Sequence, residues 1–250
     1  LETVNEIGAP VIVETVENVR LIGINRPDKR NAVNRHTAQL LKKAFEQFNQ
    51  DETVDAAVLH GVGGNFCAGY DLSEVASGQA VEQQNLTDED FRPMGPTKMM
   101  FQKPVIAAVD GAAVAGGLEL ACMCDLRVAD ETAFFGVFCR RFGVPLLDGG
   151  TVRLQRLIGL SRAMEMILTG REVGAKQAME WGLVNKIVQI GAVLGQGLEL
   201  AQTILKYPKL CMLADRRSAY YAAYEARSLD DALDFEFANG SPVVLQESQK

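Results

Sequence analysis

The chain has 250 residues, of which 48% are hydrophobic and 23% are charged. This composition is typical of a folded globular protein and excludes an intrinsically disordered chain. The 25 basic and 32 acidic side chains give a formal net charge of −7. Nucleic acid and anionic membranes attract basic surfaces, so we expect no general binding to either. At about 150 residues per domain, the length predicts one large domain or two small ones.

Membrane, secretory and metal-binding classes are also not expected. The longest apolar stretch, residues 105–124, is interrupted by Asp110 and Glu119, whereas a membrane helix needs about 18 or more apolar residues. No basic segment followed by an apolar one resembles a signal peptide. The five cysteines are an odd number, which predicts free thiols in the cytoplasm or mitochondrial matrix. Cys122 and Cys124 lack the usual spacing of zinc ligands, so we expect no metal.

Strand and helix patterns alternate from the amino terminus. Two β-branched runs, residues 11–13 and 19–25, flank Glu17-Asn18 and predict a hairpin. Asn34 is a candidate N-cap for a helix in which apolar side chains recur at three- and four-residue spacing. Strands alternating with helices predict an α/β fold with a largely parallel sheet. Further strands are predicted at 56–59, 105–109 and 183–188, and further helices at 117–124, 151–158 and 175–181.

Two stretches depart from this alternation. Residues 73–95 are polar and predict a loop that shapes a pocket. From residue 195 onward strand patterns cease, and helices are predicted at 198–205 and 216–237. The second of these helices is rich in aromatic residues. Either its own core or a neighbouring subunit would cover them, and the sequence leaves both open.

Two segments of small residues, 64–72 and 110–120, follow predicted strands. Small residues let a ligand approach the backbone, and the first turn of a helix leaves N–H groups unpaired. Two such termini facing each other would form an oxyanion hole, which stabilises a carbonyl oxygen as it gains negative charge. Taken singly, each segment is explained better by close packing of a strand against a helix.

Glu119 lies in the first turn of the helix predicted at 117–124. A carboxylate there is favoured by the helix dipole even when it points to solvent. The surrounding residues are apolar, which favours partial burial. A partly buried carboxylate has a raised pKa and can act as an acid or a base near neutral pH.

Segments 66–72 (Phe-Cys-Ala-Gly-Tyr-Asp-Leu) and 115–120 (Ala-Gly-Gly-Leu-Glu-Leu) resemble the signature of the crotonase (enoyl-CoA hydratase/isomerase) superfamily. The resemblance implies an α/β fold, a spiral of ββα units over residues 1–194. It also implies a helical region, 195–250, that assembles a trimer or a dimer of trimers. Acyl-CoA thioesters are the implied substrates, and no cofactor is needed. Further matches in family order occur at 24–27, 31–32, 124–129, 135–136, 149–151, 168–170, 175–178 and 182–184.

The same resemblance assigns roles to individual residues. The backbone N–H groups of Ala68 and Gly116 would form the oxyanion hole, and Glu119 would be catalytic. Lys29 and Arg30 are candidates for the CoA phosphates, although a solvated surface loop explains them equally well. The remaining residues implied to line the substrate path are Cys67, Gly69, Tyr70, Asp71, Leu72 and Gly117.

One position departs from the hydratase pattern. The second catalytic glutamate of the family falls at Cys139, and a thiol cannot simply replace a carboxylate in general acid–base chemistry. This argues against ordinary hydration. Asp148 is the candidate replacement, and it is equally a candidate helix N-cap. Two interpretations of Cys139 are possible: a small buried apolar group, or a nucleophile activated by Arg140 and Arg141.

The sequence therefore predicts an acyl-CoA thioester enzyme that stabilises a thioester enolate. A hydratase-like lyase is preferred, followed by an enoyl- or dienoyl-CoA isomerase and then an acyl-CoA hydrolase. A second class is a CoA-binding paralogue with weak catalysis. A third, a dinucleotide oxidoreductase, would rest on residues 61–64, Gly-Val-Gly-Gly, which lack the full G-x-G-x-x-G run.

Overall fold

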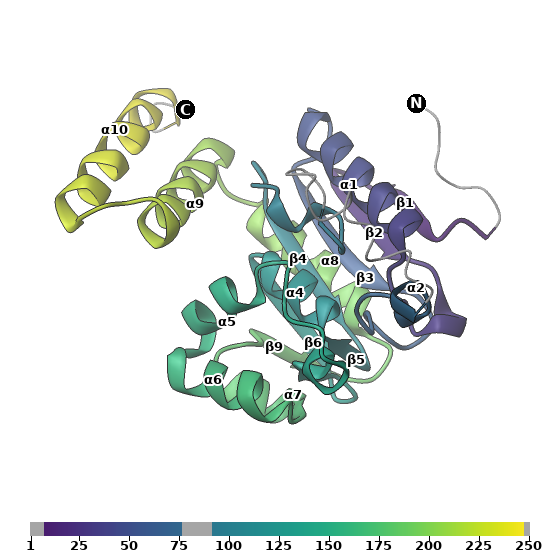
Figure 1. The fold of residues 1–250 in the computed structure, drawn as a ribbon. Coiled ribbons are helices and arrows are strands. Elements are labelled where there is room, and N and C mark those ends of the chain that lie inside the picture. Colours follow the sequence, from purple (N-terminus) through teal and green to yellow (C-terminus); the bar gives the residue numbers. More distant parts are fainter. Residues whose placement is uncertain (1–7, 77–91, 248–250) are drawn as a thin grey trace. The chain divides into compact units, whose positions relative to one another are not determined.

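The computed structural model describes residues 8–76 and 92–247. A six-stranded sheet has the order β1-β2-β3-β4-β6-β9 (Figure 1). A three-stranded sheet has the order β5-β7-β8. The strands are β1 (Val11–Val16), β2 (Val19–Ile24), β3 (Ala56–Gly61), β4 (Val105–Val109), β5 (Ala112–Val114), β6 (Leu126–Asp130), β7 (Phe134–Gly136), β8 (Val173–Gly174) and β9 (Lys186–Val188).

Helices fill the connections between these strands. The short 3-10 helices are η1 (Pro27–Lys29), η3 (Pro96–Lys98) and η4 (Phe138–Phe142). The α-helices are α1 (Arg35–Gln50), α2 (Leu72–Ala76), α4 (Gly116–Met123), α5 (Gly150–Ile158), α6 (Leu160–Thr169), α7 (Ala175–Glu180), α8 (Val193–Ile204), α9 (Lys209–Tyr224) and α10 (Leu229–Glu247).

The large sheet is parallel from β2 to β9, and β1 joins it through an antiparallel hairpin. All five residues of β4 are buried, as expected for a parallel strand with both faces covered. The predictions of the hairpin and of the largely parallel sheet are confirmed. From β4 to β7 consecutive strands alternate between the sheets, because β4 and β6 join the large sheet while β5 and β7 join the small one. Helices α4 and α5 follow these strand pairs, which gives a repeated ββα order.

Helix α1 is formed by the predicted pattern. The Asn34 side chain accepts hydrogen bonds from the N–H and the hydroxyl of Thr37, at 2.9 and 2.6 Å, so Asn34 is the N-cap. The helix lies alongside β1 and β2 (Figure 1). Its apolar face is buried, as predicted, through Ala38, Leu41, Phe45 and Phe48.

Three predicted elements differ in extent. In the strand predicted at 183–188, only Lys186–Val188 pairs, because the N–H groups of Leu183 and Val184 donate to the Ala178 carbonyl and close α7. The helix predicted at 216–237 is divided, because Ser228 accepts from the Asp231 N–H and starts α10. In the loop predicted at 73–95, residues 73–76 belong to α2, while 77–91 lie outside the described residues.

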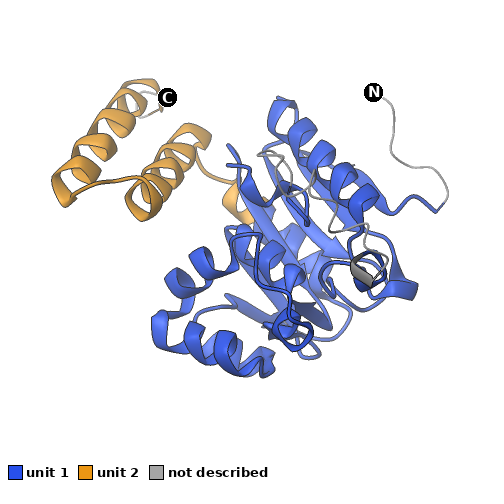
Figure 2. Cartoon of the chain, viewed as in Figure 1, with its two compact units in different colours: residues 1–201 blue, residues 202–250 orange. Residues whose placement is uncertain are grey.

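The chain divides into two compact units, residues 1–201 and 202–250 (Figure 2). The boundary predicted between residues 194 and 195 falls within α8. In the second unit α9 packs on α10, where the rings of Tyr221 and Phe235 stack with their centroids 3.9 Å apart. All five cysteines are free thiols.

Candidate active site

The two small-residue segments lie against each other, as the sequence predicts. Residues Cys67 and Ala113 form a parallel bridge, which aligns the first segment beside β5. A Cβ on Gly117 would lie 2.0 Å from the Cys67 carbonyl oxygen, and one on Gly69 would lie 3.1 Å from the Gly116 nitrogen. Glycine at these positions therefore permits the close approach of the two backbones.

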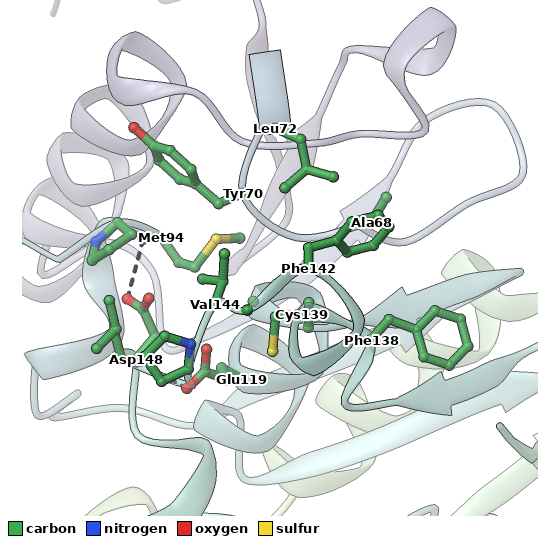
Figure 3. A pocket seen from close by; sticks show the side chains of 16 residues that line it. Ala68, Tyr70, Leu72, Met94, Glu119, Phe138, Cys139, Phe142, Val144 and Asp148 are labelled. Carbon is green, nitrogen blue, oxygen red and sulfur yellow. Dashed lines mark hydrogen bonds between the residues drawn. The ribbon is translucent and has the colours of Figure 1, made fainter. Parts of the chain in front are cut away.

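A pocket of about 380 Å³ opens where these segments meet (Figure 3). This volume falls in the usual range of small-molecule sites, and the lining is mainly apolar, with two carboxylates and one thiol. It is lined by Ala68, Tyr70, Leu72, Pro93, Met94, Ala115, Gly116, Glu119, Phe138, Cys139, Phe142, Gly143, Val144, Pro145, Leu147 and Asp148.

Only alternate residues of the first segment line this pocket. Ala68, Tyr70 and Leu72 do, as expected for extended backbone with a two-residue period. The predicted contacts from Cys67, Gly69, Asp71 and Gly117 are not found among the lining residues. These four residues are buried and hold the fold. Asp71 pairs with Arg26 at 2.9 Å, for example.

The two predicted oxyanion-hole donors differ. Gly116 begins α4, and its N–H makes no hydrogen bond to another described residue. The Ala68 N–H donates to the Arg30 carbonyl at 3.0 Å, which contradicts its predicted role. This bond belongs to a backbone ladder in which Val33 also pairs with Tyr70. The ladder leaves the Tyr70 N–H without an acceptor in the described part of the chain.

Glu119 lines the pocket and is 3% exposed, so the solvent-exposed alternative is wrong. Its Oε1 accepts hydrogen bonds from the N–H groups of Asp148 and Gly150, both at 2.8 Å. Its Oε2 accepts none from the described residues. Burial, followed by the nearby charge of Asp148, raises the pKa of Glu119 to about 7. A group with this pKa can give or take a proton near neutral pH.

Asp148 lines the same pocket and is 4% exposed. Its Oδ1 accepts hydrogen bonds from the Thr97 hydroxyl at 2.5 Å and from the Met94 N–H at 3.1 Å. Burial raises the pKa of Asp148, and these hydrogen bonds oppose the rise. The helix-cap alternative is wrong, because the N-cap of α5 is Gly149 and the first N–H of the helix is bound by Glu119.

Cys139, on η4, points into the pocket toward Glu119 (Figure 3). Burial, together with the charge of Glu119, raises the pKa of its thiol. The alternative of an arginine-activated nucleophile is therefore wrong. The Arg141 guanidinium stacks on Phe138 and donates to the Gly170 carbonyl at 2.6 Å, which directs it elsewhere.

Lys29 and Arg30 are exposed and do not line the pocket. Their side chains make no hydrogen bond or ion pair to another described residue. Their predicted contact with CoA phosphates stays a prediction.

Much of the site was missing from the sequence predictions. The apolar wall comes mainly from η4 and the residues after it, including Phe138, Phe142 and Leu147. Two aromatic residues four positions apart beside Cys139 were the available signal. Thr97 carried no signal, because it reaches Asp148 from a segment 51 positions away in the sequence.

Comparison with known proteins identifies the family. The model of the enoyl-CoA hydratase/isomerase family matches residues 14–250. The chain belongs to this family. Enoyl-CoA hydratase EchA19 of Mycobacterium tuberculosis is 34% identical over 98% of this chain and 92% of that protein. The short-chain-enoyl-CoA hydratase of Clostridium acetobutylicum is 32% identical over 96% of this chain and 91% of that protein.

The fold agrees with this family membership. A crystal structure of an enoyl-CoA hydratase from Mycobacterium tuberculosis superposes with a TM-score of 0.86 at 36% identity, covering 94% of this chain and 90% of that one. The expected crotonase fold is thereby confirmed. Within the described residues, no helix has the length and apolar character to cross a bilayer, and no three His, Cys, Asp or Glu side chains cluster as metal ligands.

Proposed function

We propose that this family member moves protons on an α,β-unsaturated acyl-CoA thioester, as a hydratase-type lyase or an isomerase. One observation carries the proposal. Glu119 and Asp148 each have an oxygen that accepts no hydrogen bond from the described residues, and both line a pocket with two unengaged N–H groups. Buried acids and free N–H donors in one apolar pocket are the groups that enolate chemistry requires.

The thioester carbonyl would lie between the N–H groups of Tyr70 and Gly116. As a proton leaves or reaches the carbon next to the carbonyl, negative charge gathers on that oxygen. Two fixed donors stabilise it, and losing one such donor typically costs about 3–4 kcal/mol of barrier. Tyr70 replaces Ala68 in this proposal because the Ala68 N–H is bound to Arg30.

Glu119 and Asp148 would act as an acid–base pair. In hydration, the base takes a proton from water as its oxygen bonds to the β-carbon, and the acid delivers a proton to the α-carbon. In isomerisation, a carboxylate removes a proton from one carbon and a proton returns at another. Because residue 139 is a cysteine and has no carboxylate, Asp148 acts as the second member of the acid–base pair. Hydrolysis of an acyl-CoA ranks below both reactions.

The proposal is tested with a panel of enoyl-, dienoyl- and hydroxyacyl-CoA substrates, following thioester absorbance and identifying products by mass spectrometry. Glu119→Gln keeps an acceptor for the N–H groups of Asp148 and Gly150 and removes proton transfer. We expect turnover to fall at least about 100-fold, with Glu180→Gln, an exposed substitution, as the control. Asp148→Asn is expected to give a similar loss.

Unchanged turnover in Glu119→Gln would refute its catalytic role. If no substrate reacts while CoA thioesters still bind in calorimetry, the chain is a CoA-binding paralogue and the enzyme proposal fails. A binding signal from NADH in the same experiment would favour the oxidoreductase alternative instead.

Lys29 and Arg30 are proposed to bind the CoA phosphates. They supply local positive charge on a chain whose net charge is −7. Replacing both with alanine is expected to raise KM for a CoA thioester. A short pantetheine thioester without the nucleotide is the matched control, because its KM should not change. An equal rise for both substrates would contradict phosphate contact.

A homo-oligomer, a trimer or a dimer of trimers, is proposed from the second unit. Leu229, Phe237 and Leu245 on α10 are 73%, 77% and 70% exposed. Such apolar side chains in one helical unit favour contact with another copy of the chain. Light scattering is expected to show an oligomer that Phe237→Glu disrupts and that Asp230→Ala, on the same helix, leaves intact. A monomeric unaltered chain would refute this assembly.

A further inference from the structure

The Asp148 carboxylate is held by a segment distant in sequence. Residues 94–97, of which Thr97 lies within η3, supply two donors to Oδ1, the Met94 N–H and the Thr97 hydroxyl. The Thr97 side chain is buried, with 3% of the residue exposed. Among the described residues, Asp148 is the one acceptor for its hydroxyl hydrogen. That hydroxyl therefore acts as a donor, and a donor binds an ionised carboxylate more strongly than a protonated one.

No other charged group described near Asp148 and Glu119 donates to the Asp148 carboxylate as the Thr97 hydroxyl does. The Arg153 guanidinium donates to the carbonyl oxygens of Asp148 and Thr97, at 3.0 and 2.6 Å, and to neither carboxylate. Arg92 acts on Asp148 through its charge, without an ion pair to it among the described contacts. The Cys67 and Cys139 thiols also lie nearby, and burial raises the pKa of each.

The two carboxylates share one pocket, so protonation of one affects the other. The donors to Glu119 are both backbone N–H groups, whereas Asp148 has one backbone donor and one hydroxyl. The hydroxyl is thus the side-chain contact that distinguishes the two acids, and a substitution can remove it without altering the backbone.

We propose that Thr97 is a positioning residue that keeps Asp148 ionised, as the proton acceptor. When the two carboxyl groups hold one proton between them, that proton then resides on Glu119. The proton-transfer part of this inference rests on the proposed function. Thr97 itself lies outside the pocket lining and acts through Asp148.

The direct test is carboxyl ¹³C NMR of protein labelled at aspartate, with the Asp148 signal assigned by Asp148→Asn. Thr97→Val removes the hydroxyl and keeps the side-chain shape. We expect the pKa of Asp148 to rise by about one unit, and Thr97→Ser to restore it. The matched control is Thr37→Val, because Thr37 is a buried threonine whose hydroxyl binds Asn34.

The same variants are compared in turnover against pH. In Thr97→Val the acid limb of kcat should move upward by about one pH unit, with KM little changed, and Thr97→Ser should restore the profile. Thr97→Ala provides a second hydroxyl-free variant if Thr97→Val does not fold. An Asp148 pKa that is equal in the unaltered chain and in a folded hydroxyl-free variant overturns the inference.

The two proposals fail in different ways. If Glu119→Gln remains fully active, the proposed function fails, while the NMR titration still decides the role of Thr97. If the Asp148 titration moves but the pH profile does not, Thr97 controls the carboxyl group and Asp148 is not the proton acceptor. That result would overturn the proton-acceptor role stated here.

Discussion

The two ends of α4 hold buried charges in opposite ways. At the C-terminal end the Arg127 side chain, on a residue 2% exposed, donates to the carbonyl oxygens of Ala121, Cys124, Asp125 and Leu183. Two of these carbonyl groups, those of Ala121 and Cys124, lie at the end of α4, where carbonyl groups lack the usual intrahelical partners. At the N-terminal end Glu119 is equally buried, but its Oε2 accepts no hydrogen bond from the described residues.

This difference separates structural charge from functional charge. A buried group whose donors are all engaged stabilises the fold, whereas a buried group with an unengaged atom costs stability and is retained where chemistry uses it. Substitution of Arg127 should therefore lower stability. Substitution of Glu119 should raise stability and abolish turnover.

The largest expected effect on stability is that of Arg127→Met. The carbonyl oxygens of Cys124, Asp125 and Leu183 lose their donor, and that of Ala121 keeps only the Cys124 N–H, at 3.3 Å. We expect the free energy of unfolding to fall by at least about 3 kcal/mol. Urea unfolding followed by the fluorescence of Trp181 measures this change. Arg140→Met, at an exposed position, is the control, and equal stabilities of the two variants would contradict the comparison.

The next effect is the pH dependence that Glu119 contributes to stability. Its folded-state pKa of about 7 lies above the ordinary value of 4.5. The folded state thus keeps a proton that the unfolded chain loses, and stability should fall as pH rises between these values and then level off. The change is on the order of 3 kcal/mol.

Glu119→Gln removes that ionisation. The variant should be more stable than the unaltered chain at pH 8, by up to about 3 kcal/mol, and of similar stability at pH 4. Thermal or urea unfolding at both pH values measures it, with Glu180→Gln as the exposed control. A variant that loses stability at pH 8 would place Glu119 with Arg127 as a structural charge.

Lys103 extends the comparison to another helix. Its ammonium group is buried near the end of α1 and donates to the carbonyl oxygens of Phe48, Asp51 and Val54. We expect Lys103→Met to lower the free energy of unfolding by about 2 kcal/mol, because the Phe48 and Val54 carbonyl groups lose their donor and the Asp51 carbonyl keeps only the Val54 N–H, at 3.5 Å. Lys43→Met, on the exposed face of α1, should change it little. If Lys103→Met leaves the free energy of unfolding unchanged, the comparison holds only for the two charges beside α4.

The smallest expected effect is a gain. Cys139→Glu places a carboxylate beside Glu119, and we expect hydration of an enoyl-CoA to rise about tenfold, which is about 1.4 kcal/mol of barrier. Cys139→Ser is the matched control, since it adds no acid. Initial rates of hydration measure both variants. If the rate of hydration does not rise in a folded Cys139→Glu protein, the proposal that the missing carboxylate at position 139 limits hydration is unsupported.

Sequence reasoning located the site better than it assigned its atoms. It placed Glu119, Asp148, Gly116 and Cys139 in one region, and all four line the pocket. It chose the N–H of Ala68, whose acceptor Arg30 lies in a different segment. No local pattern shows which N–H of an extended segment is already engaged, because that depends on a neighbour brought in by the fold.

The pattern of apolar residues by itself predicted the alternation of strands and helices, although β5, β6, β7, β8 and α6 were not among the predicted elements. Residues such as Asn34 and Phe45 act within one helix turn or two, so their spacing is visible in the sequence. The family motifs likewise fixed the fold class and the class of substrate to expect. These features are local or recur in family order, which is why a single sequence carries them.

The tertiary structure alone decided the states of the buried charges. The Arg127 side chain is engaged by four carbonyl groups, three from residues 121–125 and one from Leu183, whereas Glu119 lines the pocket with an oxygen that accepts no hydrogen bond from the described residues. Thr97 reaches Asp148 from another part of the chain. Burial and hydrogen bonding set protonation, and both depend on contacts between residues that are distant in sequence.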